Sequence, residues 1–193
     1  FIHAALPGMR RIDAVVGPVS TDALDIRVPL LSNLADGPRE SNQALWFYTC
    51  LMPRGPYPNR FVDFPLIKTR IIHWLNWSQG VTGYLHWGYN WWFKWERSRV
   101  PLDPWRDVAG ASHELEAKAS HLPPGDPFIV YPGRHGICNS IRWETVRRGV
   151  EDYEYLKLLE RRAEREPARS DLRLRIKTFL GGLKSGPLRD VRM

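Results

Sequence analysis

Apolar runs alternate with a helical pattern of polar and apolar positions in the middle of the chain. Residues 44–50 (ALWFYTC) are apolar, aromatic or β-branched almost throughout, which is typical of a buried strand. From 62 to 79, apolar side chains recur at steps of three and four, which predicts an amphipathic helix capped by Asp63. The second apolar run, 80–92 (GVTGYLHWGYNWW), predicts a strand at 81–87. Strand, helix and strand in this order predict a βαβ unit of a parallel sheet.

Two weaker apolar segments upstream predict two more strands, at 1–6 and 24–31. The stretch at 10–16 predicts a short link that is helical or looped. Four consecutive strands with helical or looped crossovers are expected to form one parallel sheet, half of an eight-stranded (β/α) barrel. The predicted fold class is therefore α/β, half of a TIM-type barrel followed by C-terminal helices.

Helical periodicity dominates the last third of the chain. A strand at 128–131 is expected to end at Pro132, and the pattern from Ser140 to Arg165 predicts a long helix with Ser140 as its cap. An amphipathic, basic helix is predicted at 170–180. The long helix is expected to bury one apolar stripe, made of Ile141, Val146, Val150, Tyr153, Leu156 and Leu159.

Basic residues are concentrated at the C-terminus. The formal net charge is +7, but residues 161–193 hold ten Lys or Arg and four Asp or Glu, which leaves a net charge of only +1 for residues 1–160. A surface that follows phosphates needs basic and aromatic residues interleaved, and here they are separated, which argues against nucleic acid as a partner. We accordingly divide the chain into a partial barrel at 1–165 and a basic C-terminal helix and tail at 166–193.

Cysteine, histidine and glycine patterns give no support for a metal or a cofactor. The six histidines are scattered, and neither Cys50 nor Cys138 has a histidine at ligand spacing, so both are expected to be buried free thiols. Gly80, Gly83 and Gly88 match no nucleotide-binding fingerprint. No apolar run approaches the ~18–20 residues of a membrane span. We therefore expect no metal, no cofactor and no membrane partner.

Aromatic and amide side chains gather where the predicted strands end. Six of the nine tryptophans lie between Trp74 and Trp95, more than core packing asks for, because each buried indole N–H needs a partner. Parallel sheets bind ligands at the carboxyl ends of their strands. The candidate substrate-binding residues are therefore Tyr48, Asn59, Trp87, Asn90, Trp91 and Tyr131.

Five of the six candidates have a structural alternative: a buried tyrosine bonded to backbone for Tyr48, a turn-forming residue for Asn59 and Asn90, and plain core for the two tryptophans. His86 is expected to be a packing histidine, because strand alternation points it away from Trp87. The remaining aromatic and charged side chains are interpreted as structural, namely Trp46, Trp74, Arg142, Glu144, Arg147, Asp152 and Glu154.

Several motifs resemble a known family. They are WFYTC, PYPNRFVDFPLIKTRIIHWLNW, GVTGYLHWGYNWW, DPFIVYPG and SIRWETVRRGVEDYEYLKLLE, within roughly residues 20–160. Together they resemble the C-terminal half of the glycoside hydrolase family 123 catalytic domain, a family that includes the domain of unknown function 4091. The resemblance implies a (β/α)8 barrel and a retaining β-N-acetylgalactosaminidase, which uses the substrate's own 2-acetamido group as nucleophile on a glycan that contains N-acetylhexosamine.

The same resemblance implies a catalytic pair of adjacent Asp and Glu residues, and this chain contains no Asp-Glu dipeptide. Glu151-Asp152 has the reverse order and lies inside a predicted helix. Because the chain also begins at Phe1 within an apolar run, we expect it to be cut from a longer polypeptide. Its missing N-terminal half would then be its partner and hold the catalytic pair, leaving the isolated chain inactive.

Two alternatives remain at this point. The chain could be a non-catalytic carbohydrate-binding or structural barrel, which an Asp-Glu pair at a strand end upstream would argue against. Nucleic-acid binding through the basic tail is the third hypothesis, and it predicts a steeply salt-dependent affinity that is lost when residues 161–193 are removed.

Overall fold

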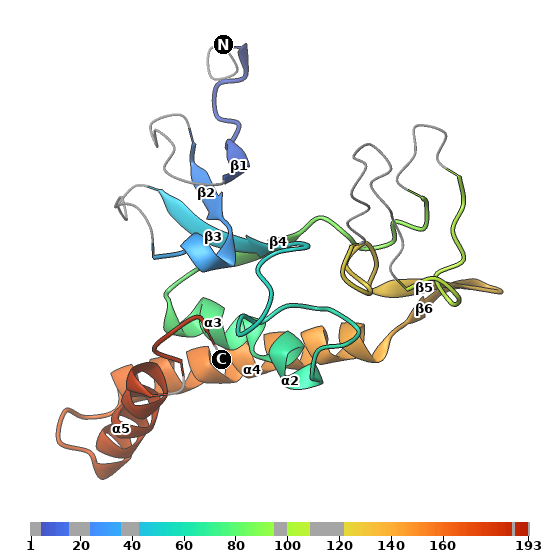
Figure 1. The fold of residues 1–193 in the computed structure, drawn as a ribbon. Coiled ribbons are helices and arrows are strands. Elements are labelled where there is room, and N and C mark those ends of the chain that lie inside the picture. Colours follow the sequence, from blue (N-terminus) through green and yellow to red (C-terminus); the bar gives the residue numbers. More distant parts are fainter. Residues whose placement is uncertain are drawn as a thin grey trace.

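A four-stranded parallel sheet forms one layer of the molecule, and helices cover one of its faces (Figure 1). The computed structural model describes residues 5–15, 24–35, 43–94, 100–108, 122–186 and 188–192. The strands are paired in chain order, β1-β2-β3-β4, and every pair is parallel. Their bounds are Ile12–Val15 for β1, Ile26–Pro29 for β2, Ala44–Thr49 for β3 and Gly83–His86 for β4.

The helical layer is built by the crossover between β3 and β4 and by the C-terminal part of the chain. Figure 1 shows the crossover helices and the long helix α4 side by side beneath the sheet. The helices are η2 (Leu31–Asn33), α2 (Leu66–Arg70), α3 (Ile72–Ser78), α4 (Ile141–Arg165) and α5 (Asp171–Ser185). An antiparallel hairpin precedes α4, formed by β5 (Val130–Gly133) and β6 (Gly136–Asn139). Among the helices of the described residues, none has the length and apolar character that crossing a bilayer requires.

The core lies between the sheet and the helices. Phe47 of β3 and Leu75 of α3 are fully buried there, and α5 adds Ile176 and Leu180 to the same cluster. Because side chains alternate along a strand, Trp46 and Tyr48 point to the face opposite Phe47. On that face Trp46, Tyr48 and Leu85 are half-buried among the described residues. Burial on the helical face stabilises the layers, and the other face holds the less covered aromatics.

The strands predicted at 24–31, 44–50 and 81–87 are confirmed, but the first strand was placed wrongly. It is β1, within the stretch interpreted as a link, whereas Ala5 and Leu6 form no strand and residues 1–4 lie outside the described part. Arg11 sets the register of β1, because its backbone N–H and its guanidinium both donate to the Asp25 carboxylate before β2. As a short edge strand with mostly exposed side chains, β1 has no apolar run that would reveal it.

The predicted helix at 62–79 is present as two segments, separated by a turn residue at Ile71. It begins after Pro65 without a side-chain cap, so the expected role of Asp63 is wrong. Gly80 ends the segment with φ +63°, in the left-handed region that glycine favours. The cap of α4 is confirmed: the Ser140 hydroxyl accepts from the Trp143 N–H at 3.1 Å.

The buried stripe of α4 agrees only in part with the apolar stripe that was predicted: Leu156 is buried, and Tyr153 and Leu159 pack against the core. Ile141 and Val150 are exposed, and the buried positions are spaced by seven residues: Arg142, Gly149, Leu156 and Ala163. The small Gly149 lets α4 touch the α2 backbone, because a Cβ there would lie 2.4 Å from the Arg70 carbonyl oxygen. Close approach of the two helix backbones, rather than apolar side chains alone, therefore orients α4.

Pro132 does not end the strand at 128–131. It lies within β5, paired with Ile137 of β6 across the hairpin. A proline is tolerated in such a two-stranded hairpin because its nitrogen can face away from the partner strand.

Candidate functional site

Three segments meet beyond the carboxyl ends of β3 and β4. They are the loop after β3, the segment that leaves β4 at Trp87, and the stretch from Asp126 to Pro132, which we call the anchor segment. The anchor segment pairs with the β4 exit, since the Ile129 N–H donates to the Tyr89 carbonyl at 2.9 Å and the Trp91 N–H donates to the Pro127 carbonyl at 3.1 Å. Carboxyl ends of parallel strands are the usual place for ligands in such sheets.

Trp87 is the first residue after β4, and its side chain is 37% exposed. Its indole N–H donates to Oδ2 of Asp126 at 3.0 Å, and its ring is stacked with that of His86 at an interplanar angle of 15°. Asp126 itself is completely buried. A buried carboxylate thus holds the polar edge of a partly exposed aromatic ring.

His86 lies beside the second oxygen of the same carboxylate, without a hydrogen bond to it. Its Nε2 lies 3.4 Å from Asp126 Oδ1, while its Nδ1 accepts the Gly88 N–H at 3.0 Å. Burial lowers the pKa of His86 well below its ordinary value, so the ring is neutral at neutral pH. Because Nδ1 is the acceptor, the single ring proton must be on Nε2, directed at Asp126.

The surroundings of Asp126 disfavour the charged form of its carboxyl group. Burial raises the pKa of its carboxyl to about 6, and the Trp87 N–H and the nearby guanidinium groups only partly oppose that effect. Since water is excluded, the charged form depends on these few partners. Perturbed carboxylates in such surroundings concentrate at functional sites, although structural networks contain them too.

Two buried arginines fasten the loops around Asp126. Arg60 donates to the Gly88 carbonyl, and Arg142 donates to the carbonyls of Arg60, Gly125 and Phe128. The backbones are in direct contact, because a Cβ on Gly88 would lie 2.4 Å from the Asp126 carbonyl oxygen. Both flanks of Asp126 are therefore fixed by charge-assisted hydrogen bonds.

Three indoles donate their N–H to the anchor segment. Trp87 bonds the Asp126 side chain, Trp92 the Val130 carbonyl at 3.0 Å, and Trp105 the Pro132 carbonyl at 3.0 Å. Each of these three indole N–H groups therefore has a hydrogen-bond acceptor, while the rings pack against neighbours or face solvent.

The comparison with known families matches the "Glycoside hydrolase 123, catalytic domain" over residues 11–159. The chain belongs to this family. The match covers most of the chain and confirms the resemblance inferred from the motifs, whereas no curated protein matches the sequence. Family membership indicates a glycoside hydrolase domain, whose substrate is a carbohydrate.

Four of the predicted residues of this glycoside hydrolase 123 domain come together at the anchor segment. Asn90 is exposed and forms a backbone bridge with Phe128. Trp91 is half-buried, with its ring edge-to-face with Phe93. Tyr131 is half-buried beside Phe128. With Trp87 they form a group of aromatic and amide side chains at one end of the sheet.

The other two predicted residues are placed differently. Tyr48 is half-buried on β3, where burial raises the pKa of its hydroxyl. Asn59 is fully buried, and its amide donates to the carbonyls of Cys50 and Pro53 at 2.9 and 3.1 Å while its oxygen accepts the Arg60 N–H. In this structure the Asn59 side chain therefore bonds the loop that follows β3.

Sequence reasoning missed Asp126, which lies in a Pro- and Gly-rich turn cluster. Arg142 is structural, as predicted, and its partners are loop carbonyls. His86 is buried as expected, but it faces a carboxylate rather than apolar neighbours alone. The usable signal was the excess of indole N–H groups, three of which donate to the anchor segment.

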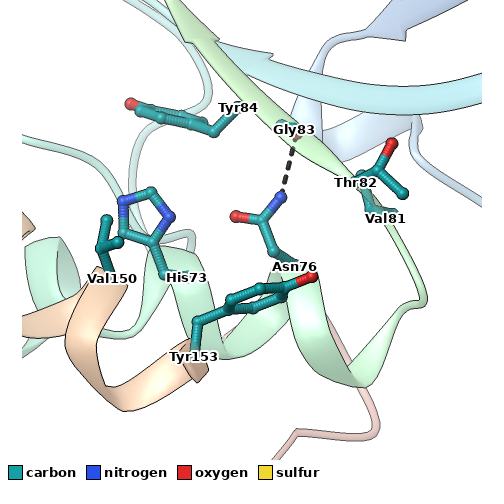
Figure 2. A pocket seen from close by; sticks show the side chains of 8 residues that line it. All are labelled: His73, Asn76, Val81, Thr82, Gly83, Tyr84, Val150 and Tyr153. Carbon is teal, nitrogen blue, oxygen red and sulfur yellow. Dashed lines mark hydrogen bonds between the residues drawn. The ribbon is translucent and has the colours of Figure 1, made fainter. Parts of the chain in front are cut away.

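A pocket of about 220 Å³ lies elsewhere in this glycoside hydrolase 123 domain, between α3, α4 and the start of β4 (Figure 2). There the Asn76 amide donates to the Gly83 carbonyl at 2.9 Å, and burial lowers the pKa of His73 to about 4. The pocket is on the helical face, at the amino end of β4, and so is separate from the group around Trp87. Across the described residues no three His, Cys, Asp or Glu side chains are grouped as metal ligands would be.

Proposed function

We propose that this chain is the C-terminal half of a (β/α)8 barrel in a retaining β-N-acetylhexosaminidase, and that it supplies the aromatic side of the sugar site. The observation that carries the proposal is Trp87, a 37%-exposed indole at the carboxyl end of β4 whose N–H is held by a buried carboxylate. An aromatic face with a fixed orientation suits the C–H face of a sugar, and the exposed Asn90 offers an amide to its hydroxyls.

In the proposed reaction the substrate's acetamido oxygen attacks the anomeric carbon, while a carboxylic acid protonates the departing glycosidic oxygen. Water then opens the cyclic intermediate and retains the anomeric configuration. Residues 1–193 contain no Asp-Glu dipeptide, so we place that catalytic pair in another part of the polypeptide. The preference for N-acetylgalactosamine rests on the family resemblance.

The test uses the polypeptide that carries both this chain and the Asp-Glu pair, with an aryl N-acetyl-β-galactosaminide as substrate. Trp87→Ala and Asn90→Ala are expected to lower kcat/KM, and Trp87→Ala by about tenfold or more, equivalent to about 1.4 kcal/mol of lost transition-state binding. Tyr155→Ala is the matched control, because Tyr155 is an aromatic residue of α4 with 68% exposure. Unchanged kinetics in both site variants would remove these residues from the sugar site.

A non-catalytic carbohydrate-binding domain is the second candidate, favoured by the missing Asp-Glu pair. It predicts that the polypeptide binds a β-N-acetylgalactosaminide, that Trp87→Ala weakens this binding, and that no sugar is released. Isothermal titration with the aryl glycoside, run beside the hydrolysis assay, separates the two functions.

A further inference from the structure

Trp105 has an unusual position for a tryptophan. It is 61% exposed, whereas the preceding Pro104 on the same turn is buried. The turn itself is well defined, since the Asp103 carboxylate accepts the Trp105 N–H at 3.0 Å and the Asp103 carbonyl accepts the Arg106 N–H at 3.1 Å. The exposed ring is therefore held by the backbone of its own turn.

The anchor segment also holds the Trp105 ring in place. The Trp105 ring lies on Tyr131, with 4.6 Å between centroids and 36° between planes, and Tyr131 in turn packs edge-to-face on the fully buried Phe128. The Trp105 indole N–H donates to Pro132 at 3.0 Å. One side of the ring is packed, the polar edge is satisfied, and much of the remaining ring surface faces solvent.

The place of Trp105 relative to Trp87 is set by the same segment. Trp87 is bonded to Asp126 and Trp105 to Pro132, six residues further along. Even a fully extended chain would separate those two attachment points by no more than about 20 Å. The strand-like pairing of Trp92 with Leu102 brings the Trp105 turn back along the β4 exit. Both indoles are thus attached to the same short segment of the chain.

We propose that the exposed face of Trp105, supported by Tyr131, is a second sugar-binding platform that takes a residue of the glycan beyond the one bound at Trp87. This inference rests on the proposed function of the Trp87 site and extends it from a single sugar to a chain. The occupant is a carbohydrate, because the family acts on carbohydrates and because the platform continues the same anchor segment. It makes the domain selective for oligosaccharides over aryl monosaccharides.

The experiment compares two substrates in the polypeptide that contains this chain and the catalytic pair. One is an aryl N-acetyl-β-galactosaminide with a single sugar, and the other is a trisaccharide with β-linked N-acetylgalactosamine at its non-reducing end. Trp105→Ala is expected to raise KM for the trisaccharide roughly tenfold, the effect of removing one indole-sized apolar contact. The loss of kcat/KM on the aryl glycoside should be clearly smaller than the loss on the trisaccharide, because the bond between Trp87 and Asp126 is kept.

Trp105→Phe keeps an aromatic ring but loses the N–H bond to Pro132, so an intermediate KM for the trisaccharide is expected. Tyr155→Ala on α4 is the control, with no change on either substrate. Equal losses on both substrates, or no loss on either, would overturn the second platform. A change in the oligomeric state of Trp105→Ala on a sizing column would also overturn it, by assigning the face to a protein contact. If Trp87→Ala still lowers hydrolysis in those cases, the proposed function stands without the platform.

Discussion

Two aspartates of this domain accept a hydrogen bond from an indole, in opposite surroundings. Asp126 accepts from Trp87 at 3.0 Å beyond the end of the sheet, and Asp152 accepts from Trp74 at 2.8 Å within the helical layer. Arg70 donates to both oxygens of Asp152, at 2.6 and 2.9 Å, and lowers the pKa of that carboxyl. No arginine bonds Asp126 directly among the contacts of the described residues, and burial raises its pKa to about 6.

The difference separates a structural contact from a candidate functional one. The Asp152 pair joins α4 to α2 and α3, and its charge is neutralised where it stands. The charged form of Asp126 is less stable than that of Asp152, because its nearest side chains are an indole and a neutral histidine. The group that Asp126 holds is a partly exposed ring. Buried carboxyl groups with a raised pKa are concentrated at functional sites. The position of Asp126 beneath an exposed aromatic ring is consistent with a role in orienting that ring.

The largest expected effects come from filling the close contacts that frame each pair. Gly88→Ala and Gly149→Ala both place a Cβ 2.4 Å from a backbone carbonyl oxygen, so each is expected to destabilise the fold by about 3 kcal/mol. Urea unfolding measures the loss. Only Gly88→Ala should also impair the sugar site, because Gly149 frames the helical pair.

Gly181→Ala on α5 is the control for these two variants. Its added Cβ meets nothing within 4 Å, and alanine in a helix interior is expected to stabilise by about 0.5–1 kcal/mol. If Gly88→Ala were as stable as the parent, the close packing of the β4 exit on the anchor segment would be wrong.

The pH dependence of stability should differ between the two aspartates. Asp126 has a raised pKa in the folded state, so its contribution to stability is fully present below the unfolded pKa, near 3.8, and is lost as the pH rises through about 6. The stability of the parent relative to Asp126→Asn should therefore fall by up to about 3 kcal/mol from pH 4 to 7. Denaturant unfolding at a series of pH values measures the difference curve.

Asp152 should behave in the opposite way. Its folded pKa is lowered, so its contribution is present above the unfolded pKa and is lost as the pH falls through the folded value. The parent relative to Asp152→Asn should be level from pH 5 to 7 and decline below about pH 4. Curves of the same sign for both variants would contradict the assigned surroundings. The titration of His73 occurs in the parent and in both variants, so it cancels from both difference curves. The ionisable groups that face Asp126 include His86, Arg54, Arg60 and Arg142.

The same two variants should differ in function. Asp126→Asn replaces one of the two carboxylate oxygens by an NH₂ group, which cannot accept the Trp87 N–H. Only one oxygen then remains next to Trp87 and His86, so the orientation of the indole is expected to loosen. We expect kcat/KM on an aryl N-acetyl-β-galactosaminide to drop about tenfold, chiefly through KM, with a red-shifted tryptophan fluorescence as Trp87 loosens. Asp152→Asn should leave hydrolysis within about twofold. Equal kinetics for the two variants would make Asp126 a purely structural residue.

Local patterns were sufficient to predict the central elements. The strands β2, β3 and β4 and the long helix α4 each have an apolar run or a cap that can be seen within a few residues, and Trp87 follows from where β4 ends. The edge strand β1 could not be found in this way, because it is held by the contact between Arg11 and Asp25, 14 residues apart, rather than by apolar side chains.

The support of the site depends on distant partners. Asp126 is 39 residues from the indole that it holds, and Arg142 donates to carbonyls of residues as far as 82 positions away. No spacing rule identifies such pairs in a single sequence, since any exposed-looking Asp or Arg is compatible with them. The sequence predicts that many indole N–H groups need hydrogen-bond acceptors, but it does not predict which acceptor each indole uses.

The smallest expected effect concerns the arginine that distinguishes the helical pair. Arg70→Lys keeps the charge but loses the two-pronged contact with Asp152, and the Arg70 side chain is 45% exposed. Exposed ion pairs contribute about 0.2–1 kcal/mol, so urea unfolding should show a loss in this range that shrinks at high salt. The bond from Trp74 to Asp152 should persist, leaving Trp74 fluorescence unchanged. A loss of several kcal/mol that is insensitive to salt would mean that Asp152 is as dependent on its partners as Asp126, and the contrast between the two pairs would disappear.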